Sequence, residues 1–182
     1  TILVTSSHRN EGVTPVALEI AGAFAASEKV LLLDANLREP DLHRRLGVNQ
    51  SPGLADVLRG EIEAARVLHP VAGRLHVLGA GLALPASEQG LIGSPAMTSC
   101  IRALREQFDR VVIDASAALE FPEPILLAPQ CDGVVLVVEA GKTKWEVAED
   151  LKTKLEQAGA RLLGLVLNKK RLFIPAWLYS RV

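Results

Sequence analysis

The chain has 182 residues, and 49% of them are hydrophobic, which is enough to bury a core without disulfides or bound metals. Its formal net charge is −1, with 20 basic and 21 acidic residues interspersed, so no basic surface is available for non-specific nucleic-acid binding. We expect one globular domain over residues 1–182, excised from a longer chain, and no nucleic-acid partner.

Neither a membrane span nor a metal-binding cysteine motif is visible. No apolar run approaches the roughly 20 uncharged residues that a membrane-spanning helix needs, and no signal peptide opens the chain. Cys100 and Cys131 have no metal-ligand spacing and lie in apolar stretches, which is typical of buried thiols in a reducing cytosol. We therefore expect a cytoplasmic location.

Strand-like and helix-like segments alternate along the chain. Short continuous apolar runs, rich in Val, Ile and Leu, predict strands covered on both faces; they occupy residues 2–5, 30–35, 75–81, 110–116, 133–141 and 162–168. Apolar residues at helical spacing predict helices at 14–28, with Thr14 as cap and Pro15 at the first position, and at 94–108 and 143–160. Residues 79–95, rich in Gly and Pro, predict a loop. The alternation indicates an α/β doubly wound fold with a mainly parallel sheet and helices on both faces.

The segment after the first strand has the outline of a phosphate-binding loop. In the pattern GxxxxGK[ST], backbone N–H groups and a helix N-terminus face the phosphates, the lysine contacts them, and the hydroxyl holds magnesium. Ser7 takes the first position here, followed after four residues by Gly12, Val13 and Thr14. The backbone can still surround a phosphate, but valine offers neither charge nor donor.

Two other strand ends carry polar side chains. Asp34, Asn36 and Arg38 follow the second predicted strand, and Asp114 ends the fourth. A carboxylate at such a position can hold a metal-bound water, and an arginine can meet a phosphate with two hydrogen bonds. Ligands of doubly wound sheets bind at the carboxyl ends of the strands, so these motifs predict one shared site.

These motifs together resemble the cytoplasmic domain of bacterial tyrosine kinases (BY-kinases) of capsule and exopolysaccharide synthesis, a family of the MinD/ParA type with deviant Walker motifs. The resemblance covers nearly the whole chain and rests on six segments in order: "TSSHRNEGVT", "VLLLDANLREPDLHRRLG", "GLADVLRGE", "FDRVVIDASAAL", the stretch from "CDGVVLVVEAG" to "GLVLNK", and the closing "IPAWLY". It implies a P-loop fold that uses ATP and Mg²⁺.

The resemblance also assigns roles to residues. It implies that Asp34, Asn36 and Asp114 are the catalytic positions, here vestigial, and that Thr14, Asp34 and Asp114 would hold Mg²⁺. The implied nucleotide- or phosphate-binding residues are Ser7, Glu11, Gly12, Val13, Thr14, Arg38 and Asn168.

Each family motif is altered in this chain. Val13 stands in place of the Walker lysine, and Arg9 in place of a proline. Asn36 replaces the second aspartate of the DxDxR motif, and Asp114 is followed by Ala-Ser-Ala where the family has Thr-Pro-Pro. The family's cluster of C-terminal tyrosines is reduced to Tyr179. We therefore expect a domain that is catalytically degenerate.

The resulting expectation is a pseudokinase that regulates or scaffolds a chain-length-determining membrane protein, a Wzz-like polysaccharide co-polymerase, at the inner face of the bacterial inner membrane. We expect no cofactor, or ATP/ADP with Mg²⁺ if the pocket still functions, and homo-oligomers are possible. One alternative is an active tyrosine autokinase or ATPase in which Arg9 or Lys142 replaces the lysine. Another is a MinD/ParA-like positioning protein.

Several of these residues also have plain structural interpretations. Asp34 and Asp114 could cap the next helix or turn, and Arg38 could pair with Glu39 or Asp41. His8 is expected to be a solvated loop residue, and the basic pair of "LHRRLG" a solvated helix face. Trp145 and Trp177 are expected to be packing or interface anchors.

Overall fold

The structure is a computed structural model that describes residues 1–170. Tyr179, Trp177 and the rest of the closing segment lie outside the described residues.

Seven strands form one sheet in the order β3-β4-β2-β5-β1-β6-β7. All neighbouring strands are parallel except β3 and β4, so the predicted α/β doubly wound, mainly parallel fold is confirmed. The strands are β1 (Ile2–Ser6), β2 (Val30–Asp34), β3 (His69–Ala72), β4 (Leu75–Leu78), β5 (Arg110–Ala117), β6 (Gly133–Glu139) and β7 (Leu162–Asn168). Strand β3 was not predicted, because it is a short edge strand that contains Pro70 and alternates between half-buried and exposed residues.

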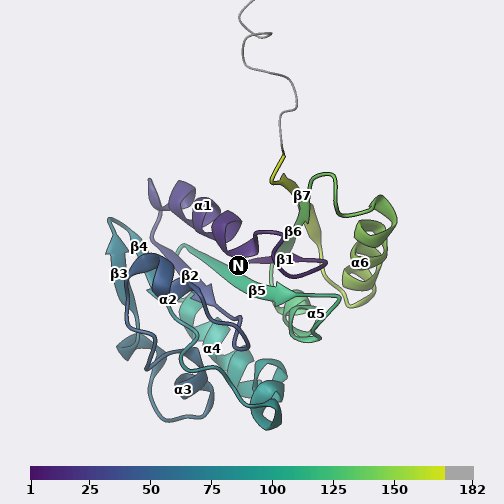
Figure 1. The fold of residues 1–182 in the computed structure, drawn as a ribbon. Coiled ribbons are helices and arrows are strands. Elements are labelled where there is room, and N and C mark those ends of the chain that lie inside the picture. Colours follow the sequence, from purple (N-terminus) through teal and green to yellow (C-terminus); the bar gives the residue numbers. More distant parts are fainter. Residues whose placement is uncertain (171–182) are drawn as a thin grey trace, which may run out of the picture.

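Helices cover both faces of this sheet (Figure 1). They are α1 (Val13–Ala25), α2 (Leu42–Leu46), α3 (Leu54–Leu58), α4 (Pro95–Arg105), α5 (Glu123–Leu127) and α6 (Trp145–Gln157). Three 3₁₀ helices, η1 (Ala64–Arg66), η2 (Ala86–Gly93) and η3 (Ala128–Gln130), complete the described chain. None of the helices in residues 1–170 has the length and apolar character needed to span a bilayer.

The core consists of two apolar clusters, one on each face of the sheet. We call them the α1 cluster, which also receives Leu42 of α2, and the α4 cluster, which also receives residues of α3 and α6. Neighbouring residues of β2 alternate between them, since Leu31 belongs to the α4 cluster and Leu32 to the α1 cluster, and both are fully buried. This alternation explains why the strand sequences are apolar without interruption.

Two local predictions about this architecture were wrong. Helix α1 begins at Val13 with Gly12 as its N-cap, so Thr14 is not the cap and Pro15 is not the first helical residue. Gly12 takes the cap because it has a left-handed backbone conformation (φ 96°) that glycine adopts without strain. The segment 79–95 is not entirely a loop, because it contains η2.

The cysteines and Trp145 can also be placed. Cys100 and Cys131 are both free; Cys100 is buried as predicted, whereas Cys131 is only half-buried. Burial raises the pKa of the Cys100 thiol to about 11 and that of Cys131 to about 12, so both thiols are unreactive at neutral pH. Trp145 is 72% exposed, so within the described residues it does not act as a packing anchor.

Candidate functional site

The loop between β1 and α1 is organised around the buried carboxylate of Glu11. Its Oε2 accepts hydrogen bonds from the backbone N–H of Ser7 (2.9 Å), the hydroxyl of Ser7 (2.7 Å) and the backbone N–H of His8 (3.0 Å). Thr143, in the loop after β6, donates its hydroxyl to the other oxygen of Glu11. Glu11 and Ser7 therefore shape the loop from inside. His8 is exposed, as expected for a solvated loop residue.

Strand β7 holds the end of the same loop. The side-chain amide of Asn168 donates to the backbone carbonyl of Glu11 (2.9 Å). At Gly12, a Cβ atom would lie 2.0 Å from Nδ2 of Asn168, so no larger residue fits without moving this contact. The amide of Asn168 thus positions the turn from which α1 begins.

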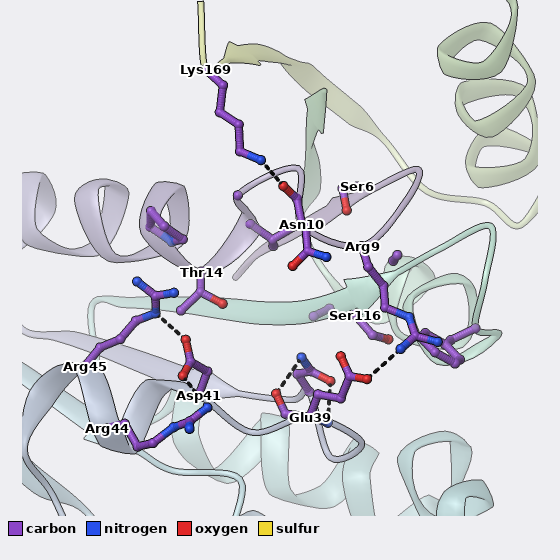
Figure 2. Close-up of a pocket in the computed structure, with 17 residues that line it drawn as sticks. Ser6, Arg9, Asn10, Thr14, Glu39, Asp41, Arg44, Arg45, Ser116 and Lys169 are labelled. Carbon is purple, nitrogen blue, oxygen red and sulfur yellow. Dashed lines mark hydrogen bonds and ion pairs between the residues drawn. The ribbon is translucent and has the colours of Figure 1, made fainter. Parts of the chain in front are cut away.

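A cavity of about 460 Å³ opens beside this loop, at the carboxyl ends of β1, β2 and β5 (Figure 2). Gly12, Val13 and Thr14 line it at the start of α1, and Asn36 lines it after β2. Its remaining lining residues come from the phosphate-loop region, the loop and helix after β2, the end of β5 and the end of β7: Ser6, Arg9, Asn10, Pro15, Glu39, Asp41, Arg44, Arg45, Ala115, Ser116, Ala117, Phe121 and Lys169.

Val13 gives this cavity an apolar wall at the position of the Walker lysine. The side chain is partly buried and packs against the α1 cluster. The backbone still offers the N-terminus of the 13-residue helix α1 to an anion. The loop therefore keeps its peptide donors and has no cation at this position.

Arg9 and Lys142, the two cations considered as replacements, are both paired with carboxylates. Arg9 contacts Glu39 (2.6 Å) and Glu120 (2.7 Å), and its guanidinium lies over the ring of Phe121. These carboxylates raise the pKa of Arg9, chiefly through its hydrogen bond with Glu120. Lys142 pairs with Glu139 (3.3 Å) and is absent from the lining of the cavity in the described chain.

Asp34 and Asp114 lie side by side, because they are register partners on β2 and β5, and neither lines the cavity in the described residues. They are only 1% and 2% exposed, and within residues 1–170 Oδ2 of Asp34 and Oδ1 of Asp114 have no hydrogen-bond partner. Burial, with the neighbouring Asp114, raises the pKa of Asp34 well above its usual value. Burial also raises the pKa of Asp114 to about 7, although a hydrogen bond with Thr14 and the charge of Arg45 lower it.

The side chains of Thr14, Asp34 and Asp114 fit a magnesium ion. Mg²⁺ prefers carboxylate and hydroxyl oxygens, and a cation would compensate two buried carboxylates that now lack partners. Asp34 does receive one local hydrogen bond, from the backbone N–H of Asn36 (3.0 Å), so its loop-capping interpretation holds for one oxygen only. The unpartnered oxygens are what the capping interpretation leaves unexplained.

Asn36 and Arg38 are engaged elsewhere. The Asn36 amide donates to the carbonyl of Glu39 (3.0 Å), and its oxygen accepts from the Glu39 N–H (3.2 Å), which closes the turn after β2. Arg38 does not line the cavity in the described residues. It pairs with Glu123 of α5 (2.6 Å) and stacks on Phe121, so within the described residues the alternative of a salt bridge with Glu39 or Asp41 is not found.

The prediction missed part of the cationic wall of the cavity. Arg44 and Arg45 of α2, expected to form a solvated helix face, both line the cavity, and so does Lys169 after β7. Their position follows from the packing of Leu42 into the α1 cluster, which a five-residue helix does not reveal through periodicity. A useful signal was available, since the basic pair follows the DxDxR-like segment within ten residues.

Comparisons with known proteins find relatives of this chain among curated sequences and solved structures. No family model matches the chain. It is 34% identical over 172 residues to the succinoglycan biosynthesis transport protein ExoP of Rhizobium meliloti, covering 92% of this chain but 22% of ExoP. It is 32% identical over 178 residues to the tyrosine-protein kinase YwqD of Bacillus subtilis, covering 94% of this chain and 73% of YwqD.

Solved structures of a bacterial kinase domain and of MinD also resemble this chain. The VpsO kinase domain superposes with a TM-score of 0.87 at 31% identity, over 93% of this chain and 84% of that one. The septum site-determining protein MinD of Pyrococcus horikoshii, solved with Mg-ADP, has a TM-score of 0.78 at 21% identity, over 98% and 75% of the two chains, and supports the fold alone. The chain therefore belongs to the family of bacterial tyrosine-kinase domains of exopolysaccharide and capsule synthesis, on a MinD/ParA-like P-loop fold.

Proposed function

We propose that this domain acts in exopolysaccharide or capsule synthesis by binding a partner, and that it does not transfer phosphoryl groups at a useful rate. The observation that carries the proposal is Val13, whose side chain packs against the α1 cluster where the family motif has a lysine. Neither Arg9 nor Lys142 replaces that lysine, because Arg9 is held by two carboxylates and Lys142 does not line the cavity in the described residues.

Magnitudes support this interpretation. A charge-assisted hydrogen bond contributes about 1.5–3 kcal/mol, so its loss weakens phosphate binding roughly tenfold to more than a hundredfold. A group aimed at developing transition-state charge is typically worth about 10²–10³ in rate. Asn36 adds to the loss, because an amide that closes its own turn replaces a carboxylate. Turnover is therefore reduced more than binding.

The magnesium position is better preserved than the lysine position. Thr14, Asp34 and Asp114 would hold the ion, which supplies positive charge to phosphate oxygens when it is bound. Asp34 and Asp114 keep unpartnered oxygens for this purpose, and Thr14 lines the cavity. This preservation also supports the second candidate function, an active tyrosine kinase like the relative YwqD.

The partner we propose is a polysaccharide co-polymerase at the cytoplasmic face of the inner membrane. ExoP, a transport protein of succinoglycan biosynthesis, contains a region that matches this chain over 22% of its length. That arrangement supports a domain joined to, or docked on, a membrane protein of the same pathway.

The test is binding to a chain-length-determining co-polymerase of the same organism, reconstituted in vesicles, with and without ATP and Mg²⁺. We expect co-sedimentation of equal strength in both conditions and no phosphate on the tyrosines of either protein. The proposal is contradicted by failure to co-sediment, or by magnesium-dependent tyrosine phosphorylation that the Asp114→Asn variant abolishes.

A further inference from the structure

We infer that Arg45, on helix α2, is the residue that neutralises the phosphates of a nucleoside diphosphate or triphosphate in this cavity, in place of the missing Walker lysine. The inference rests on the proposed function only in taking the cavity to be the family's nucleotide site. It adds that the cavity still binds the nucleotide and names the side chain that makes binding possible.

The first argument concerns which cations around the cavity are already neutralised. Arg9 contacts two carboxylates, those of Glu39 and Glu120. Lys169 shares the carboxylate of Glu139 (3.1 Å) with Lys142 (3.3 Å) and also donates to the backbone carbonyl of Asn10. Both side chains therefore have partners that a phosphate would have to displace.

Within residues 1–170 the side chain of Arg45 has one partner, whereas Arg9 and Lys169 have two each. It pairs with Asp41 through Nε (2.6 Å), while Arg44 pairs with the other oxygen of the same carboxylate (2.9 Å). Two guanidinium groups thus share one negative charge. Burial alone would raise the pKa of Asp41, but its hydrogen bond and charge interactions with Arg45 and Arg44 hold that pKa below its usual value. The trio carries a net positive charge that is available to an anion.

The second argument concerns position. Leu42 is buried in the α1 cluster, and Leu46 packs against it, as does Val13 from the start of α1. Helix α2 and the start of α1 therefore contribute to the same apolar cluster. Arg45, one residue before Leu46, lines the same cavity as Val13 and Thr14 (Figure 2).

Arg45 also shares the cavity with part of the magnesium position, because it lines the same cavity as Thr14, one of the residues that would hold the ion. Asp41 orients the guanidinium of Arg45 through Nε, and among residues 1–170 its terminal nitrogens have no hydrogen-bond partner, so they can donate to a phosphate.

The hydrogen-bond donors around the cavity suit a ligand with two linked phosphate groups. The peptide donors at the start of α1 suit one phosphate group, and a guanidinium can donate two parallel hydrogen bonds to another. Pyrophosphate carries these groups without the base or sugar, so it isolates the contact from other parts of the nucleotide.

The test uses calorimetric titration of the full chain with MgADP and with magnesium pyrophosphate. The variant is Arg45→Met. The control is Arg110→Met, because Arg110 has the same side-chain exposure as Arg45 (46%) and the same Nε–carboxylate distance (2.6 Å, to Glu28), but does not line the cavity among the described residues.

We expect Arg45→Met to weaken both ligands about tenfold to a hundredfold, the range of one charge-assisted contact, and Arg110→Met to change them by less than about twofold. Adding Val13→Lys to Arg45→Met should restore the affinity, which a merely structural role for Arg45 would not predict. Circular dichroism of each variant reports whether it is folded, and Arg45→Lys, which keeps the charge, provides a second readout if Arg45→Met unfolds.

The inference is overturned if the unmodified chain binds neither ligand, if folded Arg45→Met binds both as tightly as the Arg110→Met control, or if folded Arg45→Lys, which keeps the charge, fails to bind. These outcomes are separate from those of the proposed function. Tyrosine phosphorylation, or failure to bind the co-polymerase, would contradict that function and leave the affinity measurement unaffected.

Discussion

At the scale of single residues, Glu11 determines the shape of the phosphate loop. One carboxylate oxygen accepts from two backbone N–H groups and one hydroxyl, all of them local. Its second oxygen accepts from Thr143, 132 residues away. The resemblance implied that Glu11 binds nucleotide, but these contacts support an internal role.

The Glu11→Ala substitution should therefore destabilise the chain. It leaves buried donors without an acceptor, which costs about 1–3 kcal/mol, as measured by urea unfolding. Glu19→Ala is the matched control, since Glu19 is exposed on α1, and it should stay within about 0.5 kcal/mol. Equal effects of the two substitutions would show that the Glu11 contacts contribute nothing.

The buried carboxyls predict the pH dependence of stability without magnesium. Burial raises the folded-state pKa of Asp114 to about 7 and also raises that of Asp34, so the folded chain keeps protons that the unfolded chain loses near pH 4. The unfolded state then binds fewer protons, and the free energy of unfolding falls as pH rises through 7.

Urea unfolding in EDTA at about pH 5.5 and about pH 8 measures this fall. Asp114→Asn should flatten the dependence and be the more stable protein at the higher pH. Carboxyls with lowered pKa, such as Asp41 and Asp132, titrate below this window. A stability that rises from pH 5.5 to 8 would refute the assignment.

At the scale of elements, helix α1 depends on the turn that starts it. Gly12 has a left-handed backbone and lies against Asn168, which joins the loop to the far end of the described chain. Asn168 at the end of β7 thus fixes the turn from which α1 begins.

Two alanine substitutions compare the turn that starts α1 with the middle of the helix. Gly12→Ala should cost about 1–3 kcal/mol, because it strains the backbone and collides with Nδ2 of Asn168. Gly22→Ala, in the middle of α1 with no atom within 4 Å of the new Cβ, should instead stabilise by about 0.4–1 kcal/mol. Thermal unfolding reports both, and a loss at Gly22 comparable to that at Gly12 would contradict this picture.

At the scale of the whole molecule, stability comes from a sheet that is covered on both faces. Leu31 and Leu32 are fully buried although they point to opposite faces. Leu31→Ala and Leu32→Ala should each therefore cost about 2–5 kcal/mol in urea unfolding. Leu82→Ala, at a residue 57% exposed, should stay within about 0.5 kcal/mol. A large cost for only one of the two buried leucines would indicate a sheet with a solvated face.

The sequence predicted this fold and part of the site for a physical reason. Continuous apolar runs identify buried parallel strands, and the carboxyl ends of such strands share one edge, so Asp34 and Asp114 could be placed together. The pairing of Arg38 with Glu123, 85 residues away, has no local signal. The five-residue helices α2 and α3 are also too short to show a period, and the basic pair of α2 was predicted to form a solvated helix face.

We conclude that the domain has kept its nucleotide cavity and lost catalytic turnover. ATP hydrolysis in the presence of Mg²⁺ tests this conclusion most directly. We predict that the unmodified chain hydrolyses ATP no faster than its Asp114→Asn variant, and that Val13→Lys with Asn36→Asp raises the rate about 10²-fold or more. Hydrolysis by the unmodified chain that Asp114→Asn abolishes would contradict the account and show that this domain is a working kinase or ATPase.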